Sequence, residues 1–351
     1  MTPLEAEIRS VIAADGPIPV SRYAALCLGH PQHGYYVTRD PLGAAGDFVT
    51  APEISQMFGE LIGAWAAMVW RQMGAPERVN FIELGPGRGT LMADALRATR
   101  AVPDFRAAVV VHLVETSPAL RARQQAMLGT TASWHERIED VPDGPLIAVA
   151  NEFVDALPVD QFVKDRDGWH LRMIGLTGDR LGFVVMPDPT PGIAPADAPA
   201  GAILERRHDR PIGLVARRIA QRGGAALIID YGHAATAFGD TLQAVRQHEF
   251  ADPLADPGTA DLTTQVDFAA LARCARREGA APHGPLGQGE FLYRLGIAQR
   301  AARLQASATP QQAADIVAAL ARLTAPDQMG ELFKVLAIAD PRLGALPGFD
   351  T

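Results

Sequence analysis

The chain of 351 residues contains little of what marks several protein classes. Its two cysteines, Cys27 and Cys274, lie far apart and form no CxxC pair, so neither a zinc ribbon nor a disulfide-stabilised secreted domain is expected. Lys164 and Lys334 are the only lysines, and arginine supplies the remaining positive charge. No apolar run approaches the roughly 20 residues that a membrane-spanning helix needs. We therefore expect no metal site and no membrane insertion.

The overall charge is acidic, with a formal net charge of −8. A protein that grips nucleic-acid phosphates needs lysine and arginine on one face, so a nucleic-acid partner is not expected. A basic segment of another protein remains compatible with this charge. Residues 1–7 are too acidic for a signal or transit peptide, which predicts a cytoplasmic protein. The sequence does not predict an oligomeric state.

From residue 78 onward, strand patterns alternate with helix patterns. Strands are expected at residues 79–83, 109–115, 145–150, 225–230 and 332–338. Helices are expected at residues 90–99, 118–128, 211–222 and 266–278. This alternation predicts an α/β fold, Rossmann-like, with a mostly parallel sheet and helices on both faces. Two segments interrupt it: a β-hairpin with a Pro/Ala-rich loop at about 159–200, and a helical insertion at about 288–326.

The first 77 residues follow another pattern and predict a helical N-terminal extension before the α/β domain of 78–351. The short aromatic segment 34–38 favours a strand, and a glycine-rich loop follows it. Asp47, Phe48 and Thr50 belong to a segment that we expect to close over a site as a lid. Thr50 and Glu53 also fit a capping box at the start of the next helix, which accounts for both residues by structure alone.

The strongest motif is a glycine turn that follows the first expected strand. It comprises Glu83, Leu84, Gly85, Pro86, Gly87, Arg88, Gly89 and Thr90. Open parallel sheets bind ligands beyond the carboxyl ends of their strands, and glycine lets the backbone approach a ligand closely. The GxGxG spacing differs from the GxGxxG fingerprint of dinucleotides, and Glu83 favours a cationic ligand over a pyrophosphate. A glycine-rich turn without a ligand is the alternative.

Further carboxylates follow the next two expected strands. Glu115 ends the second strand, where a carboxylate can accept both ribose hydroxyls of a nucleoside, although it could instead cap the helix at Pro118. Asp140, beside Glu139, lies after a further strand that is presumed between residues 115 and 139; counting it as the third makes 145–150 the fourth strand and 225–230 the fifth. Adenine contacts are often made after the third strand, and a solvated loop is the alternative. Together with the glycine turn, these positions favour a nucleoside ligand.

The fourth and fifth strand ends carry the candidates for chemistry. Asn151 can orient a nitrogen nucleophile and also contact the cofactor, and Glu152 can hold a guanidinium in a bidentate pair. Asp155 is a second candidate acid, although capping the next helix would also explain it. Asp230 and Tyr231 end the fifth strand and are candidate substrate contacts, with a structural turn as the alternative.

With these residues in view, the chain resembles the MidA-type methyltransferases, a family that includes a mitochondrial complex I assembly factor that methylates arginine. The segments that carry the resemblance are His30-Pro31, Gly34-Tyr35-Tyr36, Gly46-Asp47-Phe48, Thr50 to Gln56, Phe58-Gly59-Glu60, Glu83 to Leu91, Glu115 to Pro118, Asn151-Glu152-Phe153, Asp155 to Pro158, Asp230-Tyr231-Gly232, Val266-Asp267-Phe268, Met329-Gly330 and Phe333-Lys334-Val335. Their order and density along the chain make the resemblance specific.

The resemblance implies a class I methyltransferase sheet that uses S-adenosyl-L-methionine, and a protein substrate such as a respiratory complex I subunit that is methylated on arginine. Three alternatives remain open at this point. The protein could be an assembly chaperone that binds the donor without transfer, a methyltransferase for a small molecule, or, against the glycine spacing, a nicotinamide-dependent oxidoreductase.

Overall fold

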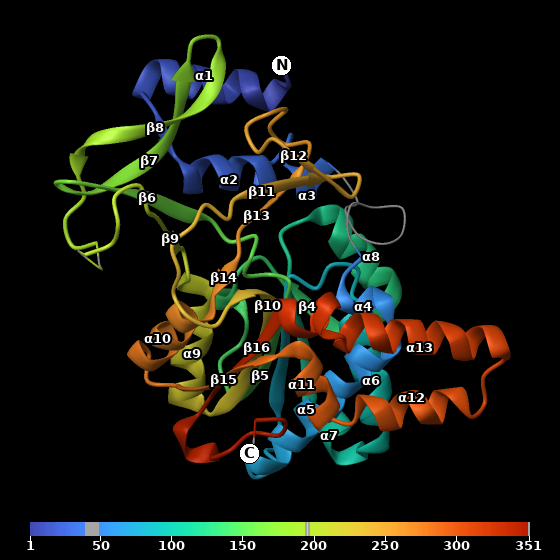
Figure 1. The fold of residues 1–351 in the computed structure, drawn as a ribbon. Coiled ribbons are helices and arrows are strands. Elements are labelled where there is room, and N and C mark those ends of the chain that lie inside the picture. The colour runs from blue at the N-terminus through green and yellow to red at the C-terminus, as the bar shows by residue number, and fades with distance from the viewer. Residues whose placement is uncertain (39–48, 194, 196, 350–351) are drawn as a thin grey trace. The chain divides into compact units, whose positions relative to one another are not determined.

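The computed structural model describes residues 1–38, 49–193, 195 and 197–349, which group into two compact units (Figure 1). Unit 1 comprises Met1–Phe48, Asp155–His208 and Thr236–Gln265. Unit 2 comprises Val49–Val154, Asp209–Ala235 and Val266–Thr351. Residues 49–77 are thus grouped with the glycine turn. The proposed boundary between an extension of 1–77 and a methyltransferase domain of 78–351 stays a prediction.

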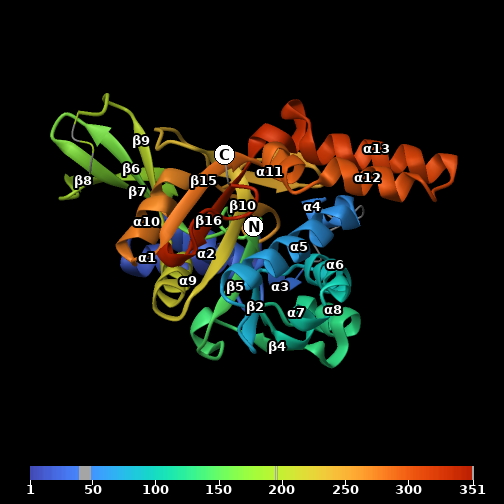
Figure 2. The same cartoon turned by 90° about the horizontal axis from the view of Figure 1, so that it is seen from below.

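Unit 2 is built on a sheet that has eight strands in the described part of the chain (Figure 2). Its strands are β2 (Val79–Leu84), β3 (Val109–Val114), β4 (Ala132–His135), β5 (Leu146–Asn151), β10 (Gly224–His233), β14 (Val266–Asp267), β15 (Ala281–Gly287) and β16 (Phe333–Ala339). The order is β15-β16-β10-β5-β2-β3-β4, with β14 beside the end of β10. The strands from β10 to β4 run parallel, and β16 is antiparallel to both of its neighbours. The carboxyl ends of β2, β3, β5 and β10 therefore share one edge, which we call the ligand edge.

Helices cover both faces of this sheet. They are α4 (Ala51–Ile54), α5 (Gln56–Gln72), α6 (Thr90–Ala98), α7 (Pro103–Ala108), α8 (Pro118–Leu128), α9 (Arg210–Arg222), α10 (Phe268–Arg277), α11 (Gln288–Arg294), α12 (Ile297–Gln305) and α13 (Pro310–Thr324). The main core joins the residues of α5, α6 and α7 to alternate residues of β2, β5 and β10. Helices α9 and α10 contact β10 and β16, whose remaining side chains are also buried. The arrangement agrees with the α/β class expected from the alternating pattern.

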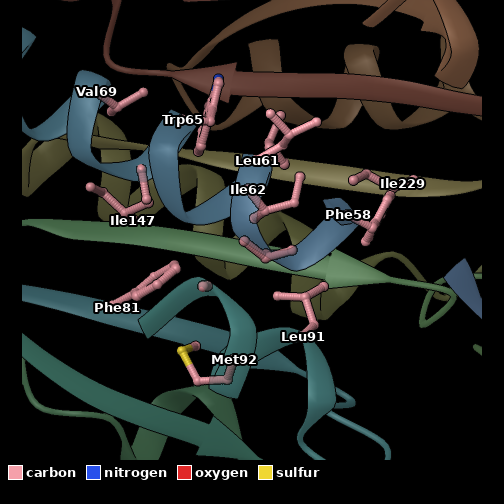
Figure 3. Packing of buried hydrophobic residues seen from close by; sticks show 14 of the residues in the cluster. Phe58, Leu61, Ile62, Trp65, Val69, Phe81, Leu91, Met92, Ile147 and Ile229 are labelled. Atoms are coloured by element: carbon pink, nitrogen blue, oxygen red, sulfur yellow. The ribbon is translucent and has the colours of Figure 1, made fainter. Parts of the chain in front are cut away.

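Helix α5 forms the centre of this core, as Figure 3 shows. Its apolar residues recur at helical spacing and are buried, among them Phe58, Ile62 and Trp65. The helix crosses α6 closely because its interface carries glycine: a Cβ on Gly63 would lie 2.5 Å from the carbonyl oxygen of Ala95. This close crossing fixes α6, and the first residue of α6 ends the glycine turn.

Unit 1 contains helices and antiparallel strands. Its helices are α1 (Pro3–Asp15), α2 (Val20–Gly29) and α3 (Tyr35–Thr38). A five-stranded sheet comprises β1 (Ile18–Pro19), β6 (Val159–Asp165), β7 (Gly168–Thr177), β8 (Arg180–Pro189) and β9 (Ile203–Arg207). A second sheet comprises β11 (Gln243–Arg246), β12 (Glu249–Ala251) and β13 (Asp261–Thr263). The hairpin predicted from residue 159 onward falls within β6, β7 and β8.

One expectation in this unit is wrong. The aromatic segment 34–38 was expected to form a strand, but Tyr35–Thr38 is a short helix. The carbonyl of Gly34 accepts the backbone N–H groups of Val37 (3.1 Å) and Thr38 (3.0 Å), and the Thr38 hydroxyl bonds it as well. These local bonds outweigh the strand preference of aromatic residues.

Across the described residues, no helix combines the length and the apolar character that crossing a bilayer requires.

Candidate active site

The glycine turn connects β2 to α6 at the ligand edge. Gly85, Gly87 and Gly89 have φ values of +63°, +54° and +88°, in a region that residues with a Cβ rarely adopt. The Gly85 N–H donates to the carbonyl of Val114 at 3.0 Å, which ties the turn to β3. A Cβ built on Gly85 would lie 2.8 Å from a ring carbon of Phe153. The turn therefore needs glycine for its backbone and for its packing.

Glu83 lies in β2, two residues before the first turn glycine, and is 3% exposed. Burial raises the pKa of its carboxyl to about 8, with an added contribution from Glu115, against the lowering effect of the Met92 N–H. One carboxyl oxygen, Oε2, has no hydrogen-bond partner among the described residues. A buried carboxyl group without a cation is suited to a positively charged ligand.

Glu115 follows β3 and is 8% exposed. Its Oε1 accepts the Ser117 N–H at 2.8 Å and its Oε2 accepts the side-chain amide of Gln124 at 3.2 Å. Burial raises the pKa of Glu115, while these donors lower it. The contact with Ser117 is a local turn before α8, and the cap of that helix is Ser117, whose hydroxyl accepts the Leu120 N–H. Each carboxylate oxygen can accept more than one bond, so capacity for ribose hydroxyls remains.

Gln124 is a residue of this site that sequence reasoning missed. It is fully buried, and its amide also donates to the Gly87 carbonyl at 2.7 Å, so it joins the glycine turn to Glu115. A signal was present in the sequence, because Gln124 occupies the same helix face as Leu120 and Leu128, at a spacing of four residues. A polar residue inside an apolar stripe needs a buried partner.

Asp140 ends a short 3₁₀ turn, Ile138–Asp140, after β4. It is exposed, and its carboxylate lies 3.7 Å from the guanidinium of Arg137. The neighbouring Glu139 accepts a bond from Arg210 at 3.1 Å. The position after β4 is the expected one, and a cofactor contact for Asp140 stays a prediction.

Asn151 and Glu152 lie side by side where β5 ends. Glu152 has a φ of +51°, a conformation that costs a non-glycine residue about 1–3 kcal/mol and that clusters at functional sites. Its Oε1 accepts the amide of Asn151 at 3.0 Å and the Ala51 N–H at 3.1 Å. Asn151 is 8% exposed, and its Oδ1 has no hydrogen-bond partner among the described residues. The pair thus presents a fixed carboxylate and a buried acceptor.

Asp230 is fully buried in β10, three residues before the strand ends at His233, so the strand runs further than the expected end at Asp230 and Tyr231. Its Oδ2 accepts the Val154 N–H and its Oδ1 accepts the Tyr231 N–H, both at 2.9 Å. These bonds hold the chain just after Glu152 against β10. Tyr231 is half-buried, with its ring 6.0 Å from that of Phe333. The contacts of Asp230 are those of a structural anchor at the ligand edge, and a substrate contact by either residue stays a prediction.

The capping box predicted at Thr50 and Glu53 is wrong. Thr50 precedes α4 but makes no side-chain capping bond, and Ser55 caps the longer helix α5 instead. The carboxylate of Glu53 accepts the hydroxyl of Thr90 at 2.5 Å, which draws it to the glycine turn. Asp47 and Phe48, the other expected lid residues, lie outside the described residues.

Asp155 belongs to unit 1. Burial raises the pKa of its carboxyl to about 6, and Arg207 opposes this shift. Its backbone carbonyl accepts bonds from Arg207 at 3.1 Å and from the Thr264 N–H at 3.2 Å. A catalytic role for Asp155 stays a prediction.

Taken together, the strand order, the glycine turn and the buried acids of unit 2 are the features expected of an α/β protein with a site for a cationic nucleoside. Glu83 and Asn151 each leave a buried oxygen without a hydrogen-bond partner among the described residues. These features fit S-adenosyl-L-methionine, whose sulfonium and amino groups are positively charged.

Comparisons with known proteins agree. The profile of a family of S-adenosyl-L-methionine-dependent methyltransferases matches residues 61–286. The chain is 40% identical to the mitochondrial protein arginine methyltransferase NDUFAF7 homolog of Drosophila melanogaster, over 95% of this chain and 84% of that protein. It is 36% identical to the mitochondrial protein arginine methyltransferase NDUFAF7 of Homo sapiens, over 96% of this chain and 83% of that protein. A crystal structure from Burkholderia thailandensis, bound to S-adenosyl-homocysteine, superposes with a TM-score of 0.82 at 29% identity, covering 99% of this chain and 92% of that one.

The chain therefore belongs to the S-adenosyl-L-methionine-dependent methyltransferases. It is an enzyme of this class, and S-adenosyl-L-methionine is its methyl donor. The predicted fold class is confirmed at the level of the α/β methyltransferase fold. The predicted cytoplasmic localisation is wrong, because the relatives from Drosophila melanogaster and Homo sapiens are mitochondrial proteins and point to mitochondria instead.

Proposed function

We propose that this protein transfers methyl groups to arginine in a protein substrate, such as a subunit of respiratory complex I. The observation that carries this proposal is the carboxylate of Glu152, held at the end of β5 by two hydrogen bonds in a left-handed backbone conformation. A guanidinium is planar and pairs with a carboxylate through two parallel bonds. The names of the relatives, which are protein arginine methyltransferases, support the choice of arginine.

We assign the donor to a set of residues at the ligand edge. The set comprises Glu83, Gly85, Pro86, Gly87, Gly89, Thr90, Glu115, Asp140 and Asn151. Glu83 offers a buried carboxyl group to the charged end of the donor, and Glu115 offers oxygens to the ribose hydroxyls. Gly85, Gly87 and Gly89 leave the backbone free of side chains at the turn. Gln124 keeps Glu115 and the turn at a fixed separation through its two bonds.

When bound, the donor supplies an electrophilic methyl group on a sulfonium. The work left to the protein is to place and polarise the nucleophile, because methyl transfer is an in-line displacement. Glu152 pairs with the guanidinium and favours the resonance form that leaves one nitrogen electron-rich. The Oδ1 of Asn151 can accept a hydrogen bond from an N–H of the guanidinium and so orient the nitrogen that receives the methyl group. Asp230 holds the backbone after Glu152, which keeps the carboxylate in place.

The test uses purified protein, labelled donor and subunits of respiratory complex I, with mass spectrometry of the modified residue. We expect label on arginine, and we expect Glu152→Ala to reduce transfer at least 100-fold while it still binds S-adenosylhomocysteine. Glu77→Ala is the matched control, since Glu77 is exposed before the amino end of β2. Label on small molecules alone would favour a small-molecule methyltransferase. Full rescue of a deletion strain by Glu152→Ala would favour a donor-binding chaperone.

A further inference from the structure

Helix α4 is a four-residue helix of unit 2 that contacts the glycine turn through Glu53. The hydroxyl of Thr90, the first residue of α6, donates to Glu53 Oε1 at 2.5 Å. The guanidinium of Arg88, within the turn, lies 3.8 Å from Glu53 Oε2. Both carboxylate oxygens of Glu53 thus face the turn that we assign to the donor.

The same helix contacts the proposed acceptor carboxylate through its first residue. The N–H of Ala51 donates to Glu152 Oε1 at 3.1 Å, and Ala51 is fully buried. Ala51 precedes Glu53 by only two residues within one helical turn. A single helical turn therefore contacts the donor turn with a side chain and the acceptor carboxylate with its backbone.

We propose that Glu53 is a positioning residue that couples the donor turn to the carboxylate of Glu152 through α4. The coupling itself is independent of the substrate, and only its consequence for transfer rests on the proposed function of Glu152. The helix has two backbone bonds at its start, from Glu53 and Ile54 to the carbonyl of Thr50 at 2.9 and 3.2 Å. A helix this short is unstable by itself, so contacts made by its side chains decide where it lies.

A purely structural role for Glu53 has a different consequence. A carboxylate near the first turn of α6 also interacts favourably with the N-terminal end of that helix. If that were its whole role, removing Glu53 would lower stability and leave the response to Thr90 and Glu152 substitutions unchanged. Positioning through α4 instead makes the effects of the three residues on donor affinity depend on one another.

The experiment measures the affinity of the full-length protein for S-adenosylhomocysteine by calorimetry, in two double-mutant cycles. The first cycle combines Glu53→Ala with Thr90→Val, and the second combines Glu53→Ala with Glu152→Ala. We expect Glu53→Ala to weaken binding about tenfold, Thr90→Val about fivefold and Glu152→Ala about threefold, which are losses typical of one hydrogen bond. Each double variant should bind no more weakly than Glu53→Ala alone.

Two further variants separate positioning from loss of stability. Glu53→Gln keeps an oxygen that can accept the Thr90 hydroxyl, so it should restore most of the affinity lost in Glu53→Ala. Thr309→Ala removes the capping box of α13, so it should lower stability without changing affinity. The proposal would be overturned if the fold-losses of affinity of the single variants simply multiplied in both double variants. Unchanged affinity in a folded Glu53→Ala would overturn it as well.

The outcome is separable from the proposed function. If no arginine is methylated but both cycles show coupling, the role of Glu53 stands and the assignment of the acceptor fails. If arginine is methylated, Glu53→Ala at saturating donor should also lower kcat about tenfold, because Glu152 loses the fixed N–H of Ala51. If arginine is methylated but neither cycle shows coupling, the proposed function stands and the positioning role of Glu53 is rejected.

Discussion

Two regions of unit 2 bury carboxylates in opposite ways. On one side of the sheet, Glu60 of α5 is 8% exposed and is held by Arg300 of α12 at 2.6 and 3.0 Å and by Arg97 of α6 at 3.0 Å. Burial by itself would raise the pKa of Glu60, but the two guanidinium groups hold it below its usual value. The arginines neutralise the charge and tie three helices together.

At the ligand edge, Glu83 is buried without such a partner, and its pKa rises to about 8. Glu115 is also buried, and its pKa is raised despite the donors around it. The difference shows where the protein supplies a cation itself and where it leaves that charge to a ligand. Glu60 is paired with two arginines and links helices, whereas the printed hydrogen bonds of the Glu115 carboxylate come from neutral donors.

The largest loss of donor affinity should come from a substitution within the glycine turn. Gly85→Val places a branched side chain at a φ of +63° and against Phe153, so the turn must distort. We expect donor affinity to fall at least 100-fold, more than about 2.7 kcal/mol. Calorimetry with S-adenosylhomocysteine measures this, and circular dichroism checks folding. Wild-type affinity in a folded variant would contradict the assignment of the turn.

The arginine-paired region should respond in stability and not in donor affinity. Glu60→Ala leaves Arg97 and Arg300 without their shared carboxylate, and we expect the free energy of unfolding to fall by about 2–3 kcal/mol. Part of the effect is screened because both arginines are partly exposed. Denaturant titration measures the loss. A weakened donor affinity at temperatures where the variant is folded would show that the two regions are not independent.

Much of the ligand edge was predictable from sequence because it is encoded locally. The glycine turn, Glu115 and the Asn151–Glu152 pair each directly follow a run of apolar strand residues. In a parallel sheet the ends of such runs meet at one edge, so the pattern places them together without further knowledge.

The parts that sequence reasoning missed depend on contacts between distant segments. Thr50 and Glu53 match a capping box, yet Glu53 bonds Thr90, which lies 37 residues further on. Similarly, the side-chain amide of Gln124 in α8 donates to the Gly87 carbonyl and to the Glu115 carboxylate, which both precede it in the chain. A local pattern cannot reveal which distant group will compete for a side chain, because the competition is decided by tertiary packing.

A smaller effect is expected at the ribose side of the ligand edge. Glu115→Ala removes a carboxylate that we assign to the ribose hydroxyls, so donor affinity should fall by ~1–3 kcal/mol. Gln124→Ala should show part of this loss, since Gln124 only positions Glu115 and the turn. Binding titrations of both variants test the order. If Glu115→Ala changes stability but not affinity, its bond to Ser117 is its main role.

The last prediction compares how Glu83 and Glu60 make the free energy of unfolding depend on pH. The pKa of Glu83 in the folded protein, about 8, exceeds its ordinary value of 4.5, so between these pH values the folded state holds a proton that the unfolded state has lost. Stability from this group is therefore present at low pH and is lost as pH rises toward 8. Relative to Glu83→Gln, the ligand-free wild type should lose stability between pH 5.5 and 8, measured as the free energy of unfolding in denaturant titrations at both pH values.

For Glu60 the sign is opposite. Its pKa is lowered in the folded protein, so its contribution is present at neutral pH and is lost as pH falls below its ordinary value of 4.5. Glu60→Gln should therefore destabilise the protein at pH 7, where Glu83→Gln stabilises it. Saturating donor should remove the advantage of Glu83→Gln, because the bound cation favours the ionised carboxylate. Equal pH profiles for the two variants, with and without donor, would mean that the two carboxylates do not differ in the way their surroundings indicate.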